Sequence, residues 1–447
     1  MQIRNTLIAA LVILAGTVLA ACGQHSDDPV PVVNDPSLFS IATGTNITGY
    51  TQLAMNSKGD ALVSWRQSNG SEEIVHAAYT TATGAFGNNS ALSDNSSILQ
   101  RTAVSENGDA FVVWEDDAGG IIGIGSNHYS PGAAWDGVVS VDTHTAGNVI
   151  EPWVATSPTG TAFAIWRQYG GGVNEVWASW RGPGPGWSTP ELLTRVTGGF
   201  AADPTVAVDT AGNAVAAWVE FQNGYTVRAK RYQAGSGWDP SSTLIGAPAD
   251  PFEPKIGMDK DGNTTVIWNY ADNGNHGVQM NRYAVGSGWS GTETIIERAD
   301  SVGFIFDPQL AVAADGTAVL AWEQSDGSKY DIWADHYTPG TGWTKYPVMV
   351  SDGTEDSQSL RVAISASGRA LAAWRQIPSQ NMSIRGAWYQ ADTGWGLPRR
   401  LSAAGDQGWP QYVNAAMDSS GNALIVWDAY YSDTQSVTIW GYRITTP

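Results

Sequence analysis

A spaced pair of residues recurs eight times along this chain and constrains its fold more than any other feature. Each copy is a glycine followed six residues later by a tryptophan, and successive tryptophans lie 49 to 54 residues apart. The pairs are Gly59/Trp65, Gly108/Trp114, Gly160/Trp166, Gly212/Trp218, Gly262/Trp268, Gly316/Trp322, Gly368/Trp374 and Gly421/Trp427. Eight similar units of about fifty residues indicate a repeat architecture, not two or three unrelated domains.

Residues 204–245 show the repeated unit in full, as four short segments of alternating polarity. Asp209 and Gly212 predict a turn in which the carboxylate accepts amide protons and the glycine takes a positive φ. Asn223-Gly224 predicts a hairpin turn. The 51 glycines and 46 aromatic residues, against 15% charged residues, are typical of many short strands. Four antiparallel strands in about fifty residues match one blade of a β-propeller.

The two ends of the chain predict how the blades close. The eighth unit ends at Pro447, soon after its third strand, and therefore lacks a fourth strand. An extended stretch at residues 37–43 precedes the first unit, at the offset where a fourth strand belongs. We therefore predict an all-β fold: an eight-bladed β-propeller of four-stranded antiparallel blades over residues 37–447, closed by the N-terminal strand completing the last blade.

The N-terminus resembles that of bacterial lipoproteins. A basic start and a short apolar run end in Leu-Ala-Ala-Cys, which resembles the lipobox whose cysteine is acylated and becomes the new N-terminus. We predict a signal peptide at residues 1–21, lipidation of Cys22, and a flexible acidic tether over residues 22–36. Gly23 stands where aspartate would imply retention in the inner membrane. We expect a secreted, lipid-anchored protein of the outer membrane, on either of its sides.

Charge restricts the partners. The net charge is −20, from 43 acidic and 23 basic residues, so the surface repels phosphate backbones and we expect no nucleic acid partner. Cys22 is the one cysteine, which excludes disulfides. Besides the lipid anchor, the expected partner is a protein or a glycan, and we expect a monomeric propeller.

The start of each first strand predicts a candidate site, because these strands line the central channel of a propeller. Nine residues before the turn glycines lie Tyr50, Leu99, Glu151, Asp203, Glu253, Asp307, Ser359 and Tyr412. Across the hairpin, within about one position of register, lie the residues that follow the repeated tryptophans: Arg66, Glu115, Arg167, Val219, Asn269, Glu323, Arg375 and Asp428. Four adjacent blades thus place a carboxylate at the channel mouth, and Arg66, Arg167 and Arg375 interrupt the acidic pattern.

Two interpretations of this acidic arc remain open. Glu151, Asp203, Glu253 and Asp307 together could bind a ligand or a cation, for which calcium is the candidate. Alternatively, each carboxylate accepts backbone N–H groups or pairs with a neighbouring arginine, for example Glu151 with Arg167. Beyond that calcium ion the sequence predicts no cofactor.

Tryptophan placement separates packing from binding. A tryptophan at one position in all eight units predicts packing between sheets. The tryptophans that occur at individual positions are the better candidates for stacking on sugars, and they are Trp153, Trp177, Trp180, Trp333, Trp388, Trp409 and Trp440.

The repeat Val-x-Asp-x-x-Gly-Asn-Ala-(x)3-Trp resembles the sialidase-type, Asp-box-like repeats of secreted bacterial propellers, over residues 45–447. Its aspartate and glycine are three residues apart, whereas the Asp box has them two apart. The nearest match to the Arg-Ile-Pro motif of sialidases is Arg375-Gln-Ile-Pro378, which is interrupted and lies in the seventh unit. We therefore transfer no arginine triad and no nucleophilic tyrosine from that family. The Gly-Trp ends of the units also resemble those of propeller lectins.

These features lead to one expected function and one alternative. We expect a membrane-anchored extracytoplasmic propeller that acts as a binding or scaffold protein and engages a protein or glycan through its loop-bearing face. No complete catalytic motif is present, so we expect no enzymatic activity. The alternative is a glycoside-acting, sialidase-like enzyme or a carbohydrate-binding lectin, for which the acidic mouth would supply two carboxylates.

Overall fold

A computed structural model describes residues 37–445, apart from 118–119, 143–146, 183, 185, 248–249, 300–302, 345, 379–381 and 404–407. The predicted signal peptide, Cys22 and the tether lie outside the described residues. The described ranges are built from strands, and they contain no helix that is long and apolar enough to span a bilayer.

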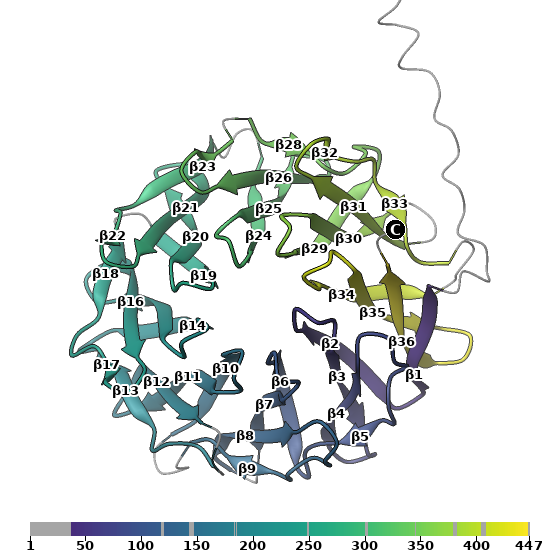
Figure 1. The fold of residues 1–447 in the computed structure, drawn as a ribbon, viewed down its shortest axis with the longest axis horizontal. Coiled ribbons are helices and arrows are strands. Elements are labelled where there is room, and N and C mark those ends of the chain that lie inside the picture. The colour runs from purple at the N-terminus through teal and green to yellow at the C-terminus, as the bar shows by residue number, and fades with distance from the viewer. Residues whose placement is uncertain are drawn as a thin grey trace, which may run out of the picture.

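Eight antiparallel sheets stand in a ring, with the first strand of each blade nearest the centre (Figure 1). Blade 1 contains β2 (Ile47–Met55), β3 (Ala61–Ser68), β4 (Glu73–Thr80) and β5 (Ser90–Ala91), blade 2 contains β6 (Ser96–Val104), β7 (Ala110–Asp117), β8 (Ile122–Tyr129) and β9 (Val139–Ser140), and blade 3 contains β10 (Val149–Thr156), β11 (Ala162–Gly170), β12 (Val173–Arg181) and β13 (Glu191–Thr194). Blade 4 contains β14 (Phe200–Val208), β15 (Ala214–Phe221), β16 (Tyr225–Gln233), β17 (Gly237–Trp238) and β18 (Thr243–Gly246), and blade 5 contains β19 (Asp250–Met258), β20 (Thr264–Asp272), β21 (Asn275–Ala284), β22 (Gly288–Trp289) and β23 (Glu293–Ala299). Blade 6 contains β24 (Ile305–Val312), β25 (Ala318–Ser325), β26 (Tyr330–Thr338), β27 (Gly342–Trp343) and β28 (Val348–Met349), blade 7 contains β29 (Asp356–Ile364), β30 (Ala370–Ile377), β31 (Ser383–Gln390), β32 (Gly394–Trp395) and β33 (Arg399–Arg400), and blade 8 contains β34 (Trp409–Met417), β35 (Ala423–Tyr431), β36 (Ser436–Ile444) and β1 (Leu38–Gly44).

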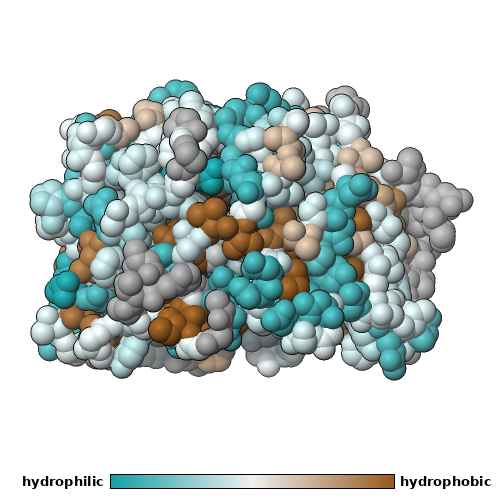
Figure 2. All heavy atoms as spheres, turned by 90° about the horizontal axis from the view of Figure 1, so that it is seen from below, coloured by the Kyte–Doolittle hydropathy of each residue, from teal (hydrophilic) through white to brown (hydrophobic). Residues whose placement is uncertain are grey.

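The predicted eight-bladed propeller is thus confirmed, with one refinement. In blades 4 to 7 the outermost strand is divided into two pieces that both pair with the third strand, and the first piece is the recurring Gly-Trp pair. The outer wall of the ring, seen from the side in Figure 2, is largely polar and carries separate apolar patches.

The predicted closure is also confirmed. β1 pairs antiparallel with β36, from Leu38 opposite Tyr442 to Gly44 opposite Val437. The N-terminal strand therefore completes the last blade, and in Figure 1 the purple strand lies against the yellow sheet. This pairing hydrogen-bonds the outer edge of β36, which would otherwise be an exposed strand edge.

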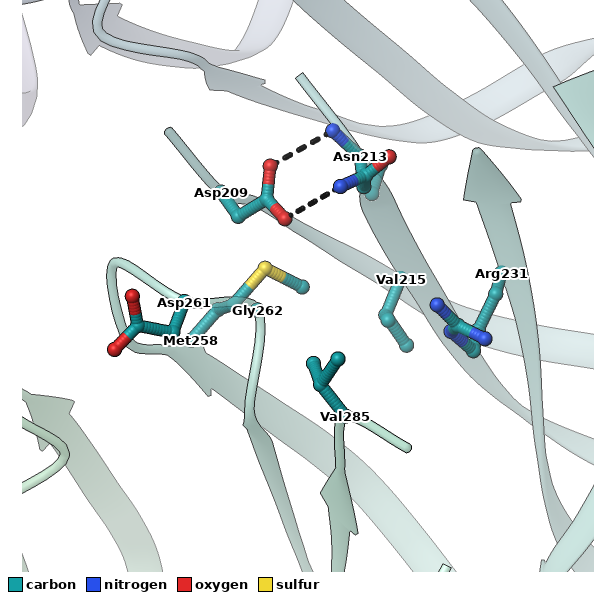
Figure 3. A pocket seen from close by; sticks show the side chains of 9 residues that line it. Asp209, Asn213, Val215, Arg231, Met258, Asp261, Gly262 and Val285 are labelled. Carbon is teal, nitrogen blue, oxygen red and sulfur yellow. Dashed lines mark hydrogen bonds between the residues drawn. The ribbon is translucent and has the colours of Figure 1, made fainter. Parts of the chain in front are cut away.

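The turn between the first and second strands forms as its residues predict. In blade 4 one carboxylate oxygen of Asp209 accepts the backbone N–H groups of Ala211 and Asn213, both at 2.8 Å, and the other accepts the side-chain amide of Asn213 (Figure 3). Gly212 has φ 81°. The aspartate fixes the turn because it satisfies amides that the strands cannot pair. At the other end of the blade, Asn223 and Gly224 form the predicted hairpin turn with positive φ angles of 70° and 136°.

The repeated tryptophans form the core, as predicted. All eight are at most 1% exposed. Each lies where neighbouring sheets pack together, and Trp218 of blade 4 is in one cluster with Phe163 and Ile165 of blade 3. Replacing such a buried ring by alanine typically costs about 3–5 kcal/mol, so these residues hold blade to blade.

Candidate functional site

Each innermost strand contains a β-bulge at the position that the sequence marks as the channel mouth. In blade 3, Ile150 pairs with Arg167 and Trp153 pairs with Ile165, so two residues face one on the partner strand. In seven blades the first bulged residue has a left-handed backbone, with φ between 40° and 59°. These residues are Tyr50, Leu99, Glu151, Asp203, Glu253, Asp307 and Ser359. Bulges re-aim side chains and are common beside functional sites.

The predicted neighbours across the hairpin are in place. In seven blades the residue after the repeated tryptophan pairs with the residue immediately before the bulge, as Phe306 does with Glu323 and Gln358 does with Arg375. In blade 8, Asp428 lies opposite the bulge itself, because Pro410 pairs with Ala429 and Val413 with Trp427. All eight pairings therefore fall within one residue of the strand register predicted from the sequence.

Glu151 and Asp203 act as hydrogen-bond acceptors between blades. One oxygen of Glu151 lies 2.6 Å from the guanidinium of Arg167, and the other accepts the backbone N–H of Asp203 at 3.2 Å. Asp203 in turn accepts the backbone N–H of Glu253 at 3.2 Å, and Glu115 accepts that of Glu151 at 2.8 Å. Burial raises the pKa of the Glu151 carboxyl, and the charge of Arg167 opposes that rise. Glu151 and Asp203 therefore accept backbone N–H groups, and Glu151 pairs with an arginine, as the second interpretation of the acidic arc describes.

A cavity of about 430 Å³ opens at the mouth over blades 5 to 7. It is lined by Glu253, Phe306, Asp307, Glu323, Tyr330, Gln358 and Ser359. Two of the four predicted carboxylates, Glu253 and Asp307, therefore face a space that can hold a small ligand.

Aromatic rings form one wall of this cavity. The rings of Phe306 and Tyr330 lie 5.5 Å apart at 71°, and Phe306 is 43% exposed. The series continues outward from Phe306 to Phe304 at 5.9 Å and from Phe304 to His276 at 4.9 Å. Exposed rings beside polar groups are typical of sites that bind amphipathic ligands such as sugars.

Two carboxylates in this cavity have different environments. Burial raises the pKa of Glu323 to about 7, and the nearby charge of Asp307 adds to the rise. The backbone N–H of Leu360 donates a hydrogen bond to Glu323 at 3.2 Å, and this bond opposes the rise in the pKa of Glu323. Asp307 instead forms an ion pair with Arg361 at 3.2 Å and accepts the side-chain amide of Gln309 at 2.6 Å. One buried carboxyl beside one ion-paired carboxylate is an arrangement suited to acid and base roles.

The three predicted arginines all lie at the mouth but have separate partners. Arg167 pairs with Glu151, as the sequence suggested. The guanidinium of Arg66 lies 3.3 Å from the centroid of the Tyr50 ring. Arg375 donates to Gln358 at 3.4 Å. They therefore do not converge on one anion site.

Two further cations at the mouth were not predicted from the sequence. Arg101 of blade 2 and Arg361 of blade 7 follow the bulges of their strands and interact electrostatically across the channel. Burial is the main cause that lowers the pKa of Arg101, and Arg361 lowers it further. Their shared offset, two residues after the bulge position, was the signal that could have found them.

The seven tryptophans proposed for sugar stacking are placed unevenly. Trp153, Trp177, Trp180, Trp333, Trp388 and Trp440 are partly buried and pack against the cores between blades. Trp409, at the start of β34, is 59% exposed. Of this set Trp409 alone offers an open ring, while Phe306 and Tyr330 at the cavity were missed.

Metal binding has no preformed ligand set in the described ranges. Among those residues, no group of three or more histidine, cysteine, aspartate or glutamate side chains is placed to hold an ion. The calcium hypothesis therefore stays a prediction.

Comparison with known proteins finds similarity at the level of structure. No family model matches the sequence, and no curated protein matches it. Among solved structures, a protein of unknown function from Dyadobacter fermentans has a TM-score of 0.43 and 10% identity, with 92% of this chain and 100% of that chain covered. An ulvan lyase has a TM-score of 0.48 and 10% identity, with 75% and 90% covered. A sialidase from Streptococcus pneumoniae has a TM-score of 0.42 and 8% identity, with 91% and 92% covered.

The comparisons correct one expectation. We expected no enzymatic activity, because no complete catalytic motif is present. The similar structures named are mostly enzymes, among them sialidases, the ulvan lyase and an arabinofuranosidase from Fusarium graminearum, so that expectation is wrong. At these identities the likeness describes a shared fold and identifies no reaction.

Proposed function

We propose that this protein is a glycoside-acting propeller, anchored outside the cytoplasm through Cys22, that binds and cleaves a glycan in the cavity over blades 5 to 7. The observation that carries the proposal is the pairing, in one cavity, of the buried Glu323 with the ion-paired Asp307 beside the exposed ring of Phe306.

The chemistry follows from the two carboxyl environments. With a pKa of about 7, Glu323 is partly protonated at neutral pH and can donate its proton to the oxygen of the glycosidic bond as that bond breaks. Asp307, held by Arg361, then accepts a proton from the water molecule whose oxygen bonds to the sugar carbon. After the bond breaks Glu323 is ionised and Asp307 is protonated. Asp307 then releases its proton to solvent and Glu323 takes one up from solvent, so both return to their starting states and the net reaction consumes one water molecule. Stacking on Phe306 and Tyr330 would hold the sugar ring.

The test combines a panel of chromogenic glycosides with a glycan array. Glu323→Gln removes the acid and should abolish cleavage of the substrate found while leaving its binding within a few-fold of wild type. Glu115→Gln is the matched control. Glu115 occupies in blade 2 the position that Glu323 occupies in blade 6, and it likewise accepts a backbone N–H at a bulge, that of Glu151 at 2.8 Å. It does not line the cavity. Full activity in Glu323→Gln would contradict the proposed acid. Glycan binding without cleavage in wild type would identify a lectin, and neither binding nor cleavage would overturn the proposal.

A further inference from the structure

A second aromatic feature lies at the mouth outside the cavity, at the junction of blades 8 and 1. The rings of Tyr50 and Tyr412 stack at 4.7 Å with an interplanar angle of 29°, although their residues are 362 positions apart in the chain. Each tyrosine is 40% exposed. Two stacked, solvent-facing tyrosines form an amphipathic platform at the surface.

The stack has an order that leaves one face free. Arg66 lies 3.3 Å from the centroid of Tyr50, and Tyr412 stacks on Tyr50 as well. A guanidinium so close to the ring leaves no space for Tyr412 on the same side, so the two partners occupy opposite faces of Tyr50. The face of Tyr412 that points away from Tyr50 carries no such partner in the stack.

Blade 7 links this platform to the cavity. Arg375 donates to Gln358, which lines the cavity, and its charge also acts on Asp428. Asp428 accepts the backbone N–H of Tyr412 at 3.3 Å and so fixes the bulge that carries the platform. Arg375 of blade 7 therefore contacts a residue of the cavity and acts by its charge on the aspartate that holds the Tyr412 bulge.

The platform is suited to binding and not to covalent chemistry. Burial is the main cause that raises the pKa of Tyr412 to about 12, and a hydrogen bond with Tyr50 and the charge of Asp428 add to it. A tyrosine that holds its proton so firmly is a poor nucleophile at neutral pH. Its ring face and hydroxyl can still contact the apolar face and a hydroxyl of a sugar.

We propose that Tyr412, supported by Tyr50 and Arg66, forms a second sugar subsite, so that the ligand of the mouth is an oligosaccharide extending over blades 6, 7 and 8 and not a monosaccharide. This inference rests on the proposed function of the cavity. It adds the size of the ligand, because the cavity lies over blades 5 to 7 and the platform belongs to blades 8 and 1.

The experiment measures affinity against chain length. Titration calorimetry uses the full chain with xylo-, arabino-, chito- and malto-oligosaccharides of one to six sugars. Every protein titrated, the otherwise wild-type reference included, carries Glu323→Gln, so that the sugars are bound and not cleaved. For the series that binds, wild type should gain at least about tenfold in affinity between one sugar and the longer members. Tyr412→Ala should remove that gain and leave the affinity for one sugar unchanged, while Tyr412→Phe should retain most of it.

Matched controls separate the two proposals. Tyr346→Ala makes the same change at a tyrosine that is 83% exposed and lies outside the mouth, and it should bind like wild type. Thermal melting of each variant checks that the propeller still folds. Equal affinity of wild type for one sugar and for six would overturn the second subsite and leave the cavity proposal standing. Retention of the chain-length gain in Tyr412→Ala would overturn it too, and failure of every series to bind would overturn both proposals.

Discussion

The buried carboxyl of Glu323 should make the stability of the propeller depend on pH in a defined way. Its pKa rises from an ordinary value of 4.5 to about 7, chiefly through burial, and Glu323 is 7% exposed. Between these values the unfolded chain releases the proton while the folded protein keeps it. The folded state then binds more protons, so the free energy of unfolding falls as pH rises. The shift corresponds to a loss of about 3 kcal/mol between pH 4.5 and pH 7.5.

Glu323→Gln isolates this contribution, because glutamine cannot ionise and can still accept the amide proton of Leu360. Urea denaturation of wild type and variant at half-unit steps from pH 4.5 to pH 8 gives the difference in free energy of unfolding. Asp428, whose pKa burial raises to about 6, is present in both proteins and cancels in this difference. The free energy of unfolding of the variant should rise relative to that of wild type by about 3 kcal/mol between pH 4.5 and pH 8. Glu293→Gln, at an exposed position of β23, should show no such gain, and parallel curves for wild type and Glu323→Gln would refute the reasoning.

Three further predictions concern the anchor, the closure and the bulges. Cys22→Ser should block acylation and move the folded protein from the membrane fraction to the soluble fraction; retention after a high-salt wash would contradict the lipoprotein prediction. Deletion of residues 24–34 should leave the melting temperature unchanged, whereas deletion extended through residues 37–43 should lower it markedly, because β1 then no longer covers β36. Leu99→Gly should keep the free energy of unfolding, measured by urea denaturation, within about 1 kcal/mol of wild type, because glycine relieves a left-handed backbone at a residue that is 41% exposed. Leu62→Gly, at a fully buried residue, should cost at least about 3 kcal/mol. Equal losses in the two variants would argue against relieved strain.

The architecture could be predicted because its determinants are local and repeated. Gly212 and Asp209 fix one turn by their own backbone and side-chain chemistry. The turn glycine, with a tryptophan six residues later, recurs in seven more units and so fixes the number of blades. The missing strand after Tyr442 and the extended residues 37–43 predicted the closure, since an unpaired edge strand needs a partner. Even the position of the channel mouth followed from counting back from the turn glycine.

The properties of the candidate site could not be predicted in the same way, because they arise between blades. Glu323 acquires its raised pKa from burial under the neighbouring blade, and no pattern within its own repeat reports that. Phe306 and Tyr330 meet because β24 and β26 place them side by side at the mouth. The bulge that turns Asp307 toward the cavity is a departure from regular pairing, which alternation of polar and apolar residues does not reveal.

The bulges explain why four similar carboxylates have unequal opportunities to bind a ligand. A bulge interrupts the ladder and leaves backbone N–H groups that need an acceptor. Glu151 and Asp203 each fill this need for the next blade, which engages both oxygens of Glu151, one of them through Arg167, and one oxygen of Asp203. Between blades 6 and 7 the second-strand residue Glu323 supplies the acceptor, through Leu360. The bulge carboxylate of blade 6, Asp307, instead pairs with Arg361 and lines the cavity, which is why we propose the reaction in this blade and not in blades 3 or 4.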